Sequence, residues 1–224
     1  MPIFILFIAL GTWQIERLHW KDGLIAQRSA GVTAPPTTLP HALDQARALE
    51  FHNVIVHGAF RNDGELYLNA ISKDGKPGYH VLTPFRLDDG RFILIERGFV
   101  PENRKMPESR PAGQIEGDTA VTGLLRVPAA KPSWFLPDNE PDRNRWFYLD
   151  LSAMASAVHL ALLPFYVDAD STPNRDGFPV GGQTNLDLPN DHLQYAITWY
   201  ALAALMPVLY FMFVRLYRRE EKIR

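Results

Sequence analysis

The chain has 224 residues, of which 46% are hydrophobic and 21% are charged, and its formal net charge is −2. This length suits one globular domain with anchoring segments, and the near-neutral balance offers none of the basic surface that nucleic-acid-binding proteins carry. There are no cysteines, which excludes disulfides, thiolate metal sites, iron–sulfur clusters and cysteine nucleophiles.

The N-terminal segment is apolar but short. Met1 to Trp13 contains no charge, and these 13 residues span only about 20 Å as a helix. It has neither the basic start nor the cleavage site of a signal peptide. Two explanations stay open: the true start lies upstream, or a short helix tilts against a second one. We predict a short first transmembrane helix with an interfacial end over residues 1–21.

The middle of the chain, residues 22–190, is predicted to form one α+β domain. It begins with an extended linker over residues 31–40, which is rich in proline and threonine. One helix is expected over residues 151–163. Strands are expected at 51–60, 65–70, 80–87, 91–100, 119–127, 145–150 and 164–168, several of them separated by turn signals such as Asp88-Asp89-Gly90. This pattern favours an antiparallel sheet or small barrel with one main helix.

The C-terminal segment has the features of a membrane helix. Between Tyr195 and Val214 there are 20 residues without a charge, which cover about 30 Å as a helix and match a bilayer core. Membrane helices tolerate a proline such as Pro207. The alternative is a buried helix of a soluble protein, but such helices rarely run this long without a charge. We therefore predict a second transmembrane helix over residues 191–217.

The tail that follows, residues 218–224, is basic. With Arg215 it supplies five positive residues against Glu220 and Glu221. Positive residues beside a membrane helix tend to stay in the cytoplasm. We therefore place both termini in the cytoplasm and residues 22–190 on the outer face of the membrane, which in a bacterium would be the periplasm.

Enzyme motifs are missing from the sequence. It contains no dinucleotide or phosphate loop, no nucleophile elbow and no zinc-protease motif, so we predict that the protein is not an enzyme. Asp168, Asp170 and Asp176 could hold a metal but lack a calcium-loop spacing, which favours turn capping. Arg97, at the end of a predicted strand, has two readings: a structural residue, which we favour, or a carboxylate-binding one.

His192 is the most informative single residue, because a titratable ring at the start of a membrane helix is unusual. It is either an interfacial histidine beside a helix cap supplied by Asn190 or Asp191, or a metal ligand, since neutral imidazole is the usual axial ligand of haem iron. Helical spacing places a set of aromatic and small residues on the face below it: Tyr195, Ala196, Trp199 and Ala203.

Three blocks of sequence resemble signatures of the Surfeit locus protein 1 family. Residues 11–21 (GTWQIERLHWK) resemble its first-span motif, residues 97–101 (RGFVP) its central motif, and residues 190–200 (NDHLQYAITWY) its second-span motif. The blocks occur in the family's order and cover both ends and the middle of the chain. The first span is shorter than is usual in the family and lacks upstream basic residues, which puts its start in doubt.

The resemblance implies an assembly factor for cytochrome c oxidase, part of respiratory-chain biogenesis, and the missing mitochondrial presequence favours a bacterial member in the cytoplasmic (inner) membrane. Bacterial relatives are thought to bind haem a and pass it to oxidase subunit I, and haem a synthase is a further candidate partner. Carried over by position, the haem-iron ligand is His192. The other candidate haem-binding residues are Tyr195, Trp199, Trp13 and Gln14, and His19 is a conceivable second axial ligand.

Three hypotheses about function follow. The first is a haem-handling chaperone whose site lies between the two spans near the outer surface. The second is a scaffold that stabilises oxidase subunit intermediates without binding haem, through the sheet domain or its hairpin edge. The third, a membrane-tethered hydrolase, is disfavoured because no nucleophile, base and orienting group can be assembled from the sequence.

Overall fold

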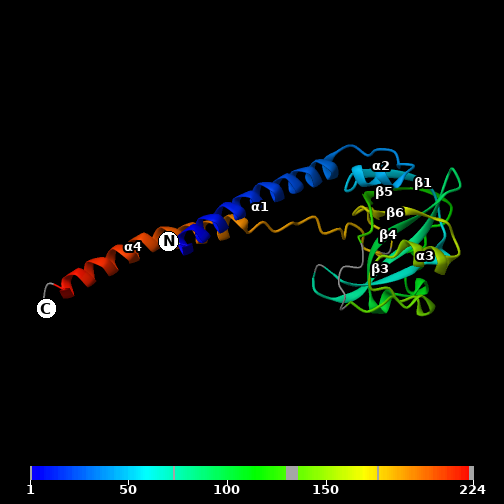
Figure 1. Ribbon diagram of the computed structural model, residues 1–224. Helices are drawn as coiled ribbons and strands as arrows, with labels where there is room; N and C mark the ends of the chain where they lie inside the picture. Colours follow the sequence, from blue (N-terminus) through cyan, green and yellow to red (C-terminus); the bar gives the residue numbers. More distant parts are fainter. Residues whose placement is uncertain (1, 73, 130–135, 176, 222–224) are drawn as a thin grey trace. The chain divides into compact units, whose positions relative to one another are not determined.

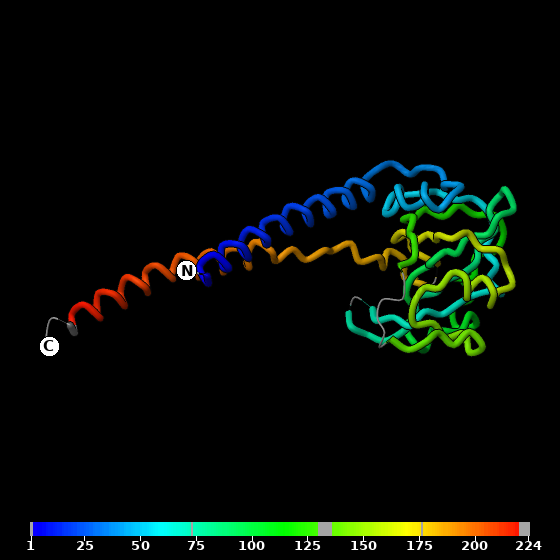
Figure 2. Tube along the Cα trace, viewed as in Figure 1, coloured from blue at the N-terminus to red at the C-terminus, as the bar shows by residue number. Residues whose placement is uncertain are grey.

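The computed structural model describes residues 2–72, 74–129, 136–175 and 177–221, and it divides into two compact units. One unit comprises Met1–Gln27 with Leu186–Arg224, and the other comprises Arg28–Asn185. The first unit contains most of the long helix α1 (Pro2–Thr33) and all of α4 (His192–Glu221), and the second contains the last residues of α1 and the strands (Figure 1). The first and last segments of the chain therefore belong to the same unit, as the tube in Figure 2 also shows.

Helix α1 is longer than the predicted segment over residues 1–21, because it continues to Thr33. The predicted helix ends at residue 21 because charged residues interrupt the apolar run there. A helix need not end there, because the residues that follow are mostly good helix formers such as glutamine, glutamate, arginine and leucine. The predicted linker over residues 31–40 is therefore partly helical. Its extended part is tied to the sheet, since Thr37 N donates to Asn53 O at 2.9 Å.

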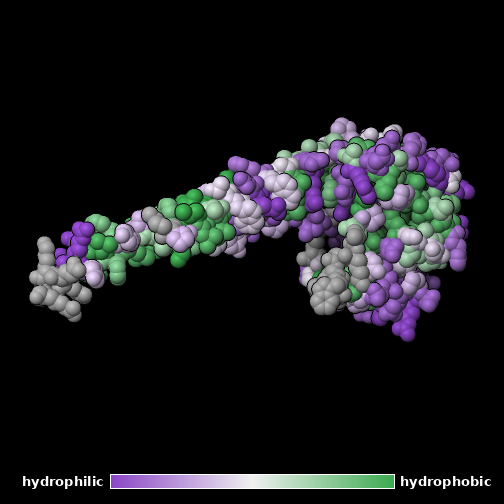
Figure 3. Space-filling view, viewed as in Figure 1, coloured by the Kyte–Doolittle hydropathy of each residue, from purple (hydrophilic) through white to green (hydrophobic). Residues whose placement is uncertain are grey.

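Helix α4 begins at His192 and passes through Pro207 without ending. Within the residues that the structure describes, it is the one helix long and apolar enough to cross a membrane. Little of its surface is covered by the rest of the chain, and Figure 3 shows hydrophobic residues along it. Its second half exposes a continuous set of large apolar side chains: Leu205, Val208, Leu209, Tyr210, Phe211, Met212, Phe213, Leu216 and Tyr217.

The second unit is a five-stranded barrel with one added strand. Strands β1 (Asn53–Phe60), β5 (Asp118–Arg126), β6 (Leu162–Ala169), β4 (Phe92–Pro101) and β3 (Pro77–Leu87) are neighbours in that order, and β3 pairs with β1 to close the ring. Strand β2 (Leu66–Ile71) pairs with the first half of β3, outside the ring. This confirms the small barrel of α+β class.

One pairing in the barrel differs from the predicted antiparallel sheet, since β4 and β6 run parallel. All the other paired strands are antiparallel. The reason is geometric, because strand direction cannot alternate all the way round a closed ring with an odd number of strands. The parallel pair is where the alternation fails, because β6 lies between β5 and β4 in the ring although it follows both of them in the chain.

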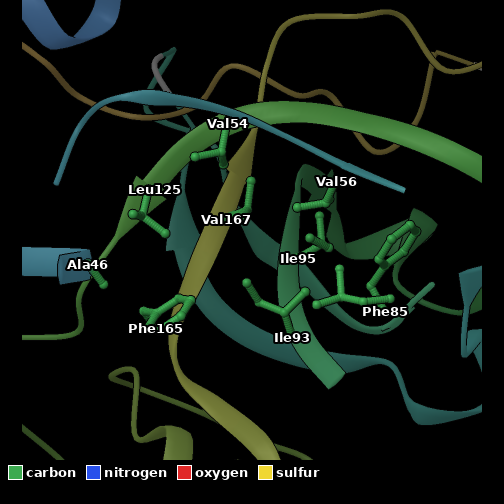
Figure 4. Packing of buried hydrophobic residues seen from close by; sticks show 10 residues of the cluster. Ala46, Val54, Val56, Phe85, Ile93, Ile95, Leu125, Phe165 and Val167 are labelled. Atoms are coloured by element: carbon green, nitrogen blue, oxygen red, sulfur yellow. The ribbon is translucent and has the colours of Figure 1, made fainter. Parts of the chain in front are cut away.

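The period-2 alternation of the strands divides the apolar residues between two cores. Alternate residues such as Ile93, Ile95, Phe165 and Val167 fill the barrel interior, together with Val54 and Val56 of β1 (Figure 4). Ala46 of the short helix α2 (Leu43–Ala48), which was not predicted, also belongs to this inner core. Residues between them, such as Leu94 and Tyr166, face outwards and form a second core with residues of β2, β3, helix α3 (Leu151–Val158) and the segment before it: Leu66, Leu82, Leu94, Trp146, Leu151, Met154 and Tyr166.

Two further predictions about this unit were wrong in part. Helix α3 (Leu151–Val158) ends before residue 163, because His159 takes a left-handed conformation (φ 56°) that stops it. Residues 145–150 do not form a strand and make only isolated bridges, one of them between Trp146 and Leu68. The apolar character of this segment reflects the full burial of the Trp146 ring in the outer core rather than membership of the sheet.

The parallel pairing of β4 and β6 places two acidic residues, Glu96 and Asp168, side by side and buried. Burial and the neighbouring charge of Glu96 raise the pKa of Asp168 well above its ordinary value. Burial acts in the same direction on Glu96, but the hydrogen bond and charge of His80 outweigh it, so the pKa of Glu96 is lowered. The pKa values of the two carboxyl groups are therefore shifted in opposite directions.

The suggested cluster of Asp168, Asp170 and Asp176 gains no support as a metal site. Asp168 Oδ2 accepts hydrogen bonds from Arg126 and Thr184, and Asp170 Oδ1 accepts one from Thr172 N, as a turn-capping carboxylate does. Asp176 lies outside the described residues. Within the described ranges, no group of three or more histidines and acidic residues is arranged to hold a metal ion.

Candidate functional site

Helices α1 and α4 pack against each other in antiparallel register within the first unit. The rings of Phe7 and Trp199 lie 5.7 Å apart between centroids. Further along α1, the Thr12 hydroxyl lies 3.2 Å from the Tyr200 hydroxyl, and Gln14 contacts His192. Increasing residue numbers on α1 thus meet decreasing numbers on α4, and His192 lies against the middle of α1.

Each helix presents a narrow stripe to the other. On α1 the residues that contact α4 or the segment just before it recur at helical spacing, at Phe7, Gly11, Gln14 and Lys21. On α4 the small residues Ala196 and Ala203 are both buried on the stripe that starts at His192. Small residues on such a stripe let two helices approach closely.

Gly11 shows how close this approach is. A Cβ added at this position would lie 2.6 Å from Cε1 of the Tyr200 ring, so a larger residue would displace either the ring or the helix. Gly23, elsewhere on the same helix, has open space around it. Glycine is therefore required at Gly11 by the close packing of α4, whereas packing does not require it at Gly23.

The contact between Gln14 and His192 defines the chemistry of the site. The carbonyl oxygen of the Gln14 amide accepts a hydrogen bond from His192 Nδ1 at 2.6 Å. A carbonyl oxygen can only accept, so this contact requires a proton on Nδ1, and the tautomer with its single proton there has its lone pair on Nε2. Gln14 is itself buried. Its amide therefore fixes both the tautomer and the orientation of the imidazole, as the outer partner of a metal-binding histidine does.

Polar contacts just before α4 hold its first residue in place. The Lys21 ammonium donates a hydrogen bond to the carbonyl of Pro189, and Asn190 Nδ2 donates one to Asp22 Oδ1 at 2.8 Å. Asn190 therefore contacts α1 and does not supply the helix cap considered above. Both contacts join α1 to the two residues that precede Asp191 and His192, so they set the register that brings His192 to Gln14.

The structure brings some of the predicted site residues together and leaves others apart. His192 and Gln14 are in contact, and Trp199 is half-buried against Phe7. Trp13 and Tyr195 are 51% and 56% exposed and lie away from the buried stripes. Each helical residue advances about 100° around the axis, so Trp13 is turned away from Gln14, and Tyr195 lies at the edge of the face that carries Ala196.

His19, considered above as a second axial ligand, is also exposed. Five residues beyond Gln14, it lies about 140° around the helix from the stripe that faces α4. Sequence reasoning also missed Phe7, Gly11 and the Lys21–Pro189 contact. The signal that could have found them is the spacing of Phe7, Gly11, Gln14 and Lys21, which is that of one face of a helix packed on a partner.

The site lies where the apolar part of each helix ends. On α1, Gln14 follows the apolar segment and precedes Glu16 and Arg17, and on α4, His192 precedes the apolar segment and follows Asp191. The antiparallel register therefore matches the two polar–apolar boundaries to each other. An imidazole with a free Nε2 at such a boundary can bind a metal centre whose surroundings are partly apolar.

Comparisons with known proteins show the family to which the chain belongs. The model of the SURF1 family matches residues 2–204 of the chain. Surfeit locus protein 1 of Homo sapiens is 39% identical over 218 residues, which cover 90% of this chain and 72% of the human protein. Surfeit locus protein 1 of Takifugu rubripes is 37% identical over 218 residues, covering 90% of each chain. The SURF1-like protein of Drosophila melanogaster is 33% identical over 220 residues, covering 90% of this chain and 72% of its own. The chain belongs to the SURF1 family.

Proposed function

We propose that this protein is an assembly factor for cytochrome c oxidase that binds haem a as a transient cargo and assists its insertion into subunit I. It is a binding protein in this proposal, not an enzyme. Membership of the SURF1 family supports the assembly role, as does the presence of the three signature blocks at residues 11–21, 97–101 and 190–200.

One observation carries the haem-binding part of the proposal: the hydrogen bond from His192 Nδ1 to Gln14. It leaves Nε2 as the lone-pair donor that an axial ligand of haem iron needs. Trp199 and Phe7 supply aromatic surface on the same side of the helix pair. Trp13 and Tyr195 remain proposed contacts on the exposed surface, because they do not line the Gln14–His192 contact.

We further propose that the protein lies in the cytoplasmic membrane of a bacterium. Helix α4 would cross the bilayer, as its length and exposed apolar surface allow. The apolar part of α1 would form a second, shorter span that is paired with α4. The basic residues after Val214 support a cytoplasmic C-terminus. The barrel would then face the periplasm, and the Gln14–His192 site would lie at the outer membrane surface.

The proposed function can be tested in a bacterial strain that lacks this protein and still makes haem a. The strain is complemented with the wild type, with His192→Ala or with His19→Ala. The haem a content of purified oxidase is then measured. We expect His19→Ala to restore fully loaded oxidase, and we expect subunit I to lack haem a with His192→Ala. Full loading with His192→Ala would reject the haem-delivery role.

The scaffold hypothesis remains as a second candidate because of one feature of the barrel. Strand β2 lies outside the closed ring, and Ile71 at its end is 73% exposed. An apolar residue at the end of an edge strand suits a protein contact. This candidate predicts that Ile71→Asp reduces co-purification with subunit I, whereas His192→Ala leaves it unchanged. Haem a synthase is a further candidate partner for the same co-purification experiment.

A further inference from the structure

The barrel unit contains a cavity that the proposed function does not use. Its volume is about 710 Å³, which is within the range of sites for small molecules. It lies between residues 119–122 of β5, the end of β6 and the loops at residues 111–116 and 172–175. All the residues that line it belong to the unit Arg28–Asn185.

Arg97 of β4 lines this cavity although it is only 3% exposed. Its guanidinium lies over the ring of Phe60, with its Cζ atom 4.5 Å from the ring centroid, and Nη2 donates to the carbonyl of Gly113. Nη1 is buried and has no hydrogen-bond partner among the described residues, and Glu65 Oε1 lies 3.7 Å from it. The arginine is therefore held firmly, yet its hydrogen-bonding capacity is not filled.

Glu65 does not neutralise Arg97 fully, because a second arginine competes for it. Arg110 is completely buried and donates from both Nη atoms to the two oxygens of the Glu65 carboxylate. Gln114 and Tyr67 also donate to this carboxylate. Two buried guanidinium groups thus share one carboxylate, which leaves one positive charge without a buried carboxylate of its own among the residues that the structure describes.

The uncompensated charge is present at neutral pH. Burial lowers the pKa of Arg97 to about 10, which is still far above neutrality. A buried charge without a counter-ion is costly, and an anion placed in the cavity would reduce that cost. The cavity is the side from which Arg97 can be approached, since Arg97 forms part of its wall.

The remaining charges of the cavity limit what the anion can be. Glu116 and Arg175 are exposed, and Asp170 is partly buried and accepts a hydrogen bond from Thr172 N. Exposed charges are screened by solvent, whereas the charge of Arg97 is not, so one negative group is favoured beside Arg97. A second negative group near the partly buried Asp170 would be repelled. Phe60, Ile115 and Val121 supply apolar wall for the rest of the ligand.

We propose that this cavity binds a small organic monocarboxylate, with its carboxylate beside Arg97 and its apolar body against Phe60, Ile115 and Val121. The site belongs to the barrel unit alone and does not involve His192. It adds a ligand-binding role to the proposed function and does not depend on it. In this proposal the central motif at residues 97–101 contributes Arg97 to a second ligand site, separate from the haem site.

The test uses the full-length protein in detergent and isothermal titration calorimetry with four probes: 3-phenylpropanoate, its uncharged amide, phenylsuccinate and inorganic phosphate. We expect 3-phenylpropanoate to bind roughly tenfold or more tightly than the amide, as a charge-assisted hydrogen bond predicts. We expect phenylsuccinate to bind more weakly and phosphate to give no binding. Equal binding of the acid and the amide, or tighter binding of phenylsuccinate or phosphate, would overturn the proposal.

Three variants test whether the acid binds in this cavity. Ala120→Trp adds bulk to an exposed position in the cavity wall without touching the buried arginines, and it should abolish binding. Ile55→Trp places the same side chain on β1, outside the cavity lining, and should bind as the wild type does. Arg97→Lys keeps the charge but loses the planar fork, so it should bind more weakly.

Undiminished binding by Ala120→Trp or by Arg97→Lys would contradict the proposed site. His192→Ala separates this proposal from the haem proposal, because it should leave the affinity for 3-phenylpropanoate unchanged. Loss of that affinity in His192→Ala would show that the acid binds elsewhere and would likewise contradict the cavity site.

Discussion

At the scale of single residues, Gln14 is as important to the account as His192. Its buried amide oxygen accepts a hydrogen bond from Nδ1 of His192 and so leaves Nε2 available. We predict that Gln14→Leu weakens haem binding about 10–100-fold, the usual effect of removing the partner that orients a metal-binding histidine. The affinity is measured by titrating purified protein with haem and following the absorption spectrum.

Two further variants give this prediction its controls. Gln14→Glu keeps a carbonyl-type acceptor at the same position and should retain most of the affinity. Trp13→Leu changes the exposed neighbour of Gln14 and so measures the contribution of outer aromatic surface separately. An unchanged affinity in Gln14→Leu would mean that His192 does not need this hydrogen bond, or that it does not bind haem.

Asp168 leads to a prediction about stability and pH. Its pKa is raised in the folded protein, so the folded state binds more protons than the unfolded one above about pH 4. Stability therefore decreases as the pH rises from there towards the raised pKa, by about 1.4 kcal/mol for each unit of the shift. Asp168→Asn resembles the protonated side chain and should remove this decrease, so that it matches or exceeds the wild type at pH 8.

Thermal unfolding of the full chain in detergent, followed between pH 5 and pH 9, measures this effect. The lowered pKa of Glu96 acts with the opposite sign, but it does so below this pH window. Asp89→Asn alters an exposed carboxylate on the β3–β4 turn and serves as the control. If Asp168→Asn were clearly less stable at pH 8, Asp168 would be ionised and paired with Arg126, which lies 3.0 Å away.

At the scale of the elements, the packing of α1 on α4 depends on Gly11. We predict that Gly11→Leu forces the Tyr200 ring away and shifts α1, which lengthens the Gln14–His192 contact and lowers haem affinity about as much as Gln14→Leu does. Gly23→Leu is the matched control on the same helix, because its added side chain meets nothing within 4 Å. Haem titration of both variants provides the comparison.

An equal effect of the two glycine substitutions would point to a change in helix stability rather than in packing. A lack of effect at Gly11 would show that the helix pair opens when ligand binds. In either case the close approach of α1 and α4 would not be what positions His192.

The sequence predicted the elements well where one periodicity dominates. Alternation at Val54 and Val56 indicated β1, and the uncharged run after His192 indicated α4, because in each case a single environment acts along the whole segment. The failures have a different cause. The apolar residues of 145–150 serve one buried tryptophan, and the parallel β4–β6 pair follows from ring closure, which no local pattern encodes.

The candidate site was predictable to a similar extent. His192 stood out from its position alone, and Gln14 followed from the family resemblance. Their contact could not be foreseen, because it depends on the register of two helices that are far apart in the chain. The same register explains why Trp13 and Tyr195, neighbours of the site in sequence, are turned towards its outside.

At the scale of the whole molecule, the proposed topology can be tested directly because the chain contains no cysteine. Single cysteines at Pro2, Asp118 and Arg218 are treated with a membrane-impermeant maleimide. We predict that Asp118→Cys is labelled in intact spheroplasts, and that Pro2→Cys and Arg218→Cys are labelled only after permeabilisation. Labelling of Pro2→Cys in intact spheroplasts would instead indicate a single span with an outer N-terminus.

The central claim is that His192 binds haem iron, and the absorption spectrum of the purified protein tests it most directly. The protein is isolated from a host that makes haem a, as wild type, His192→Ala and His19→Ala. We predict that the wild type and His19→Ala carry the haem a spectrum and that His192→Ala has lost it. Full haem occupancy in His192→Ala, or a wild type without haem, would contradict the account.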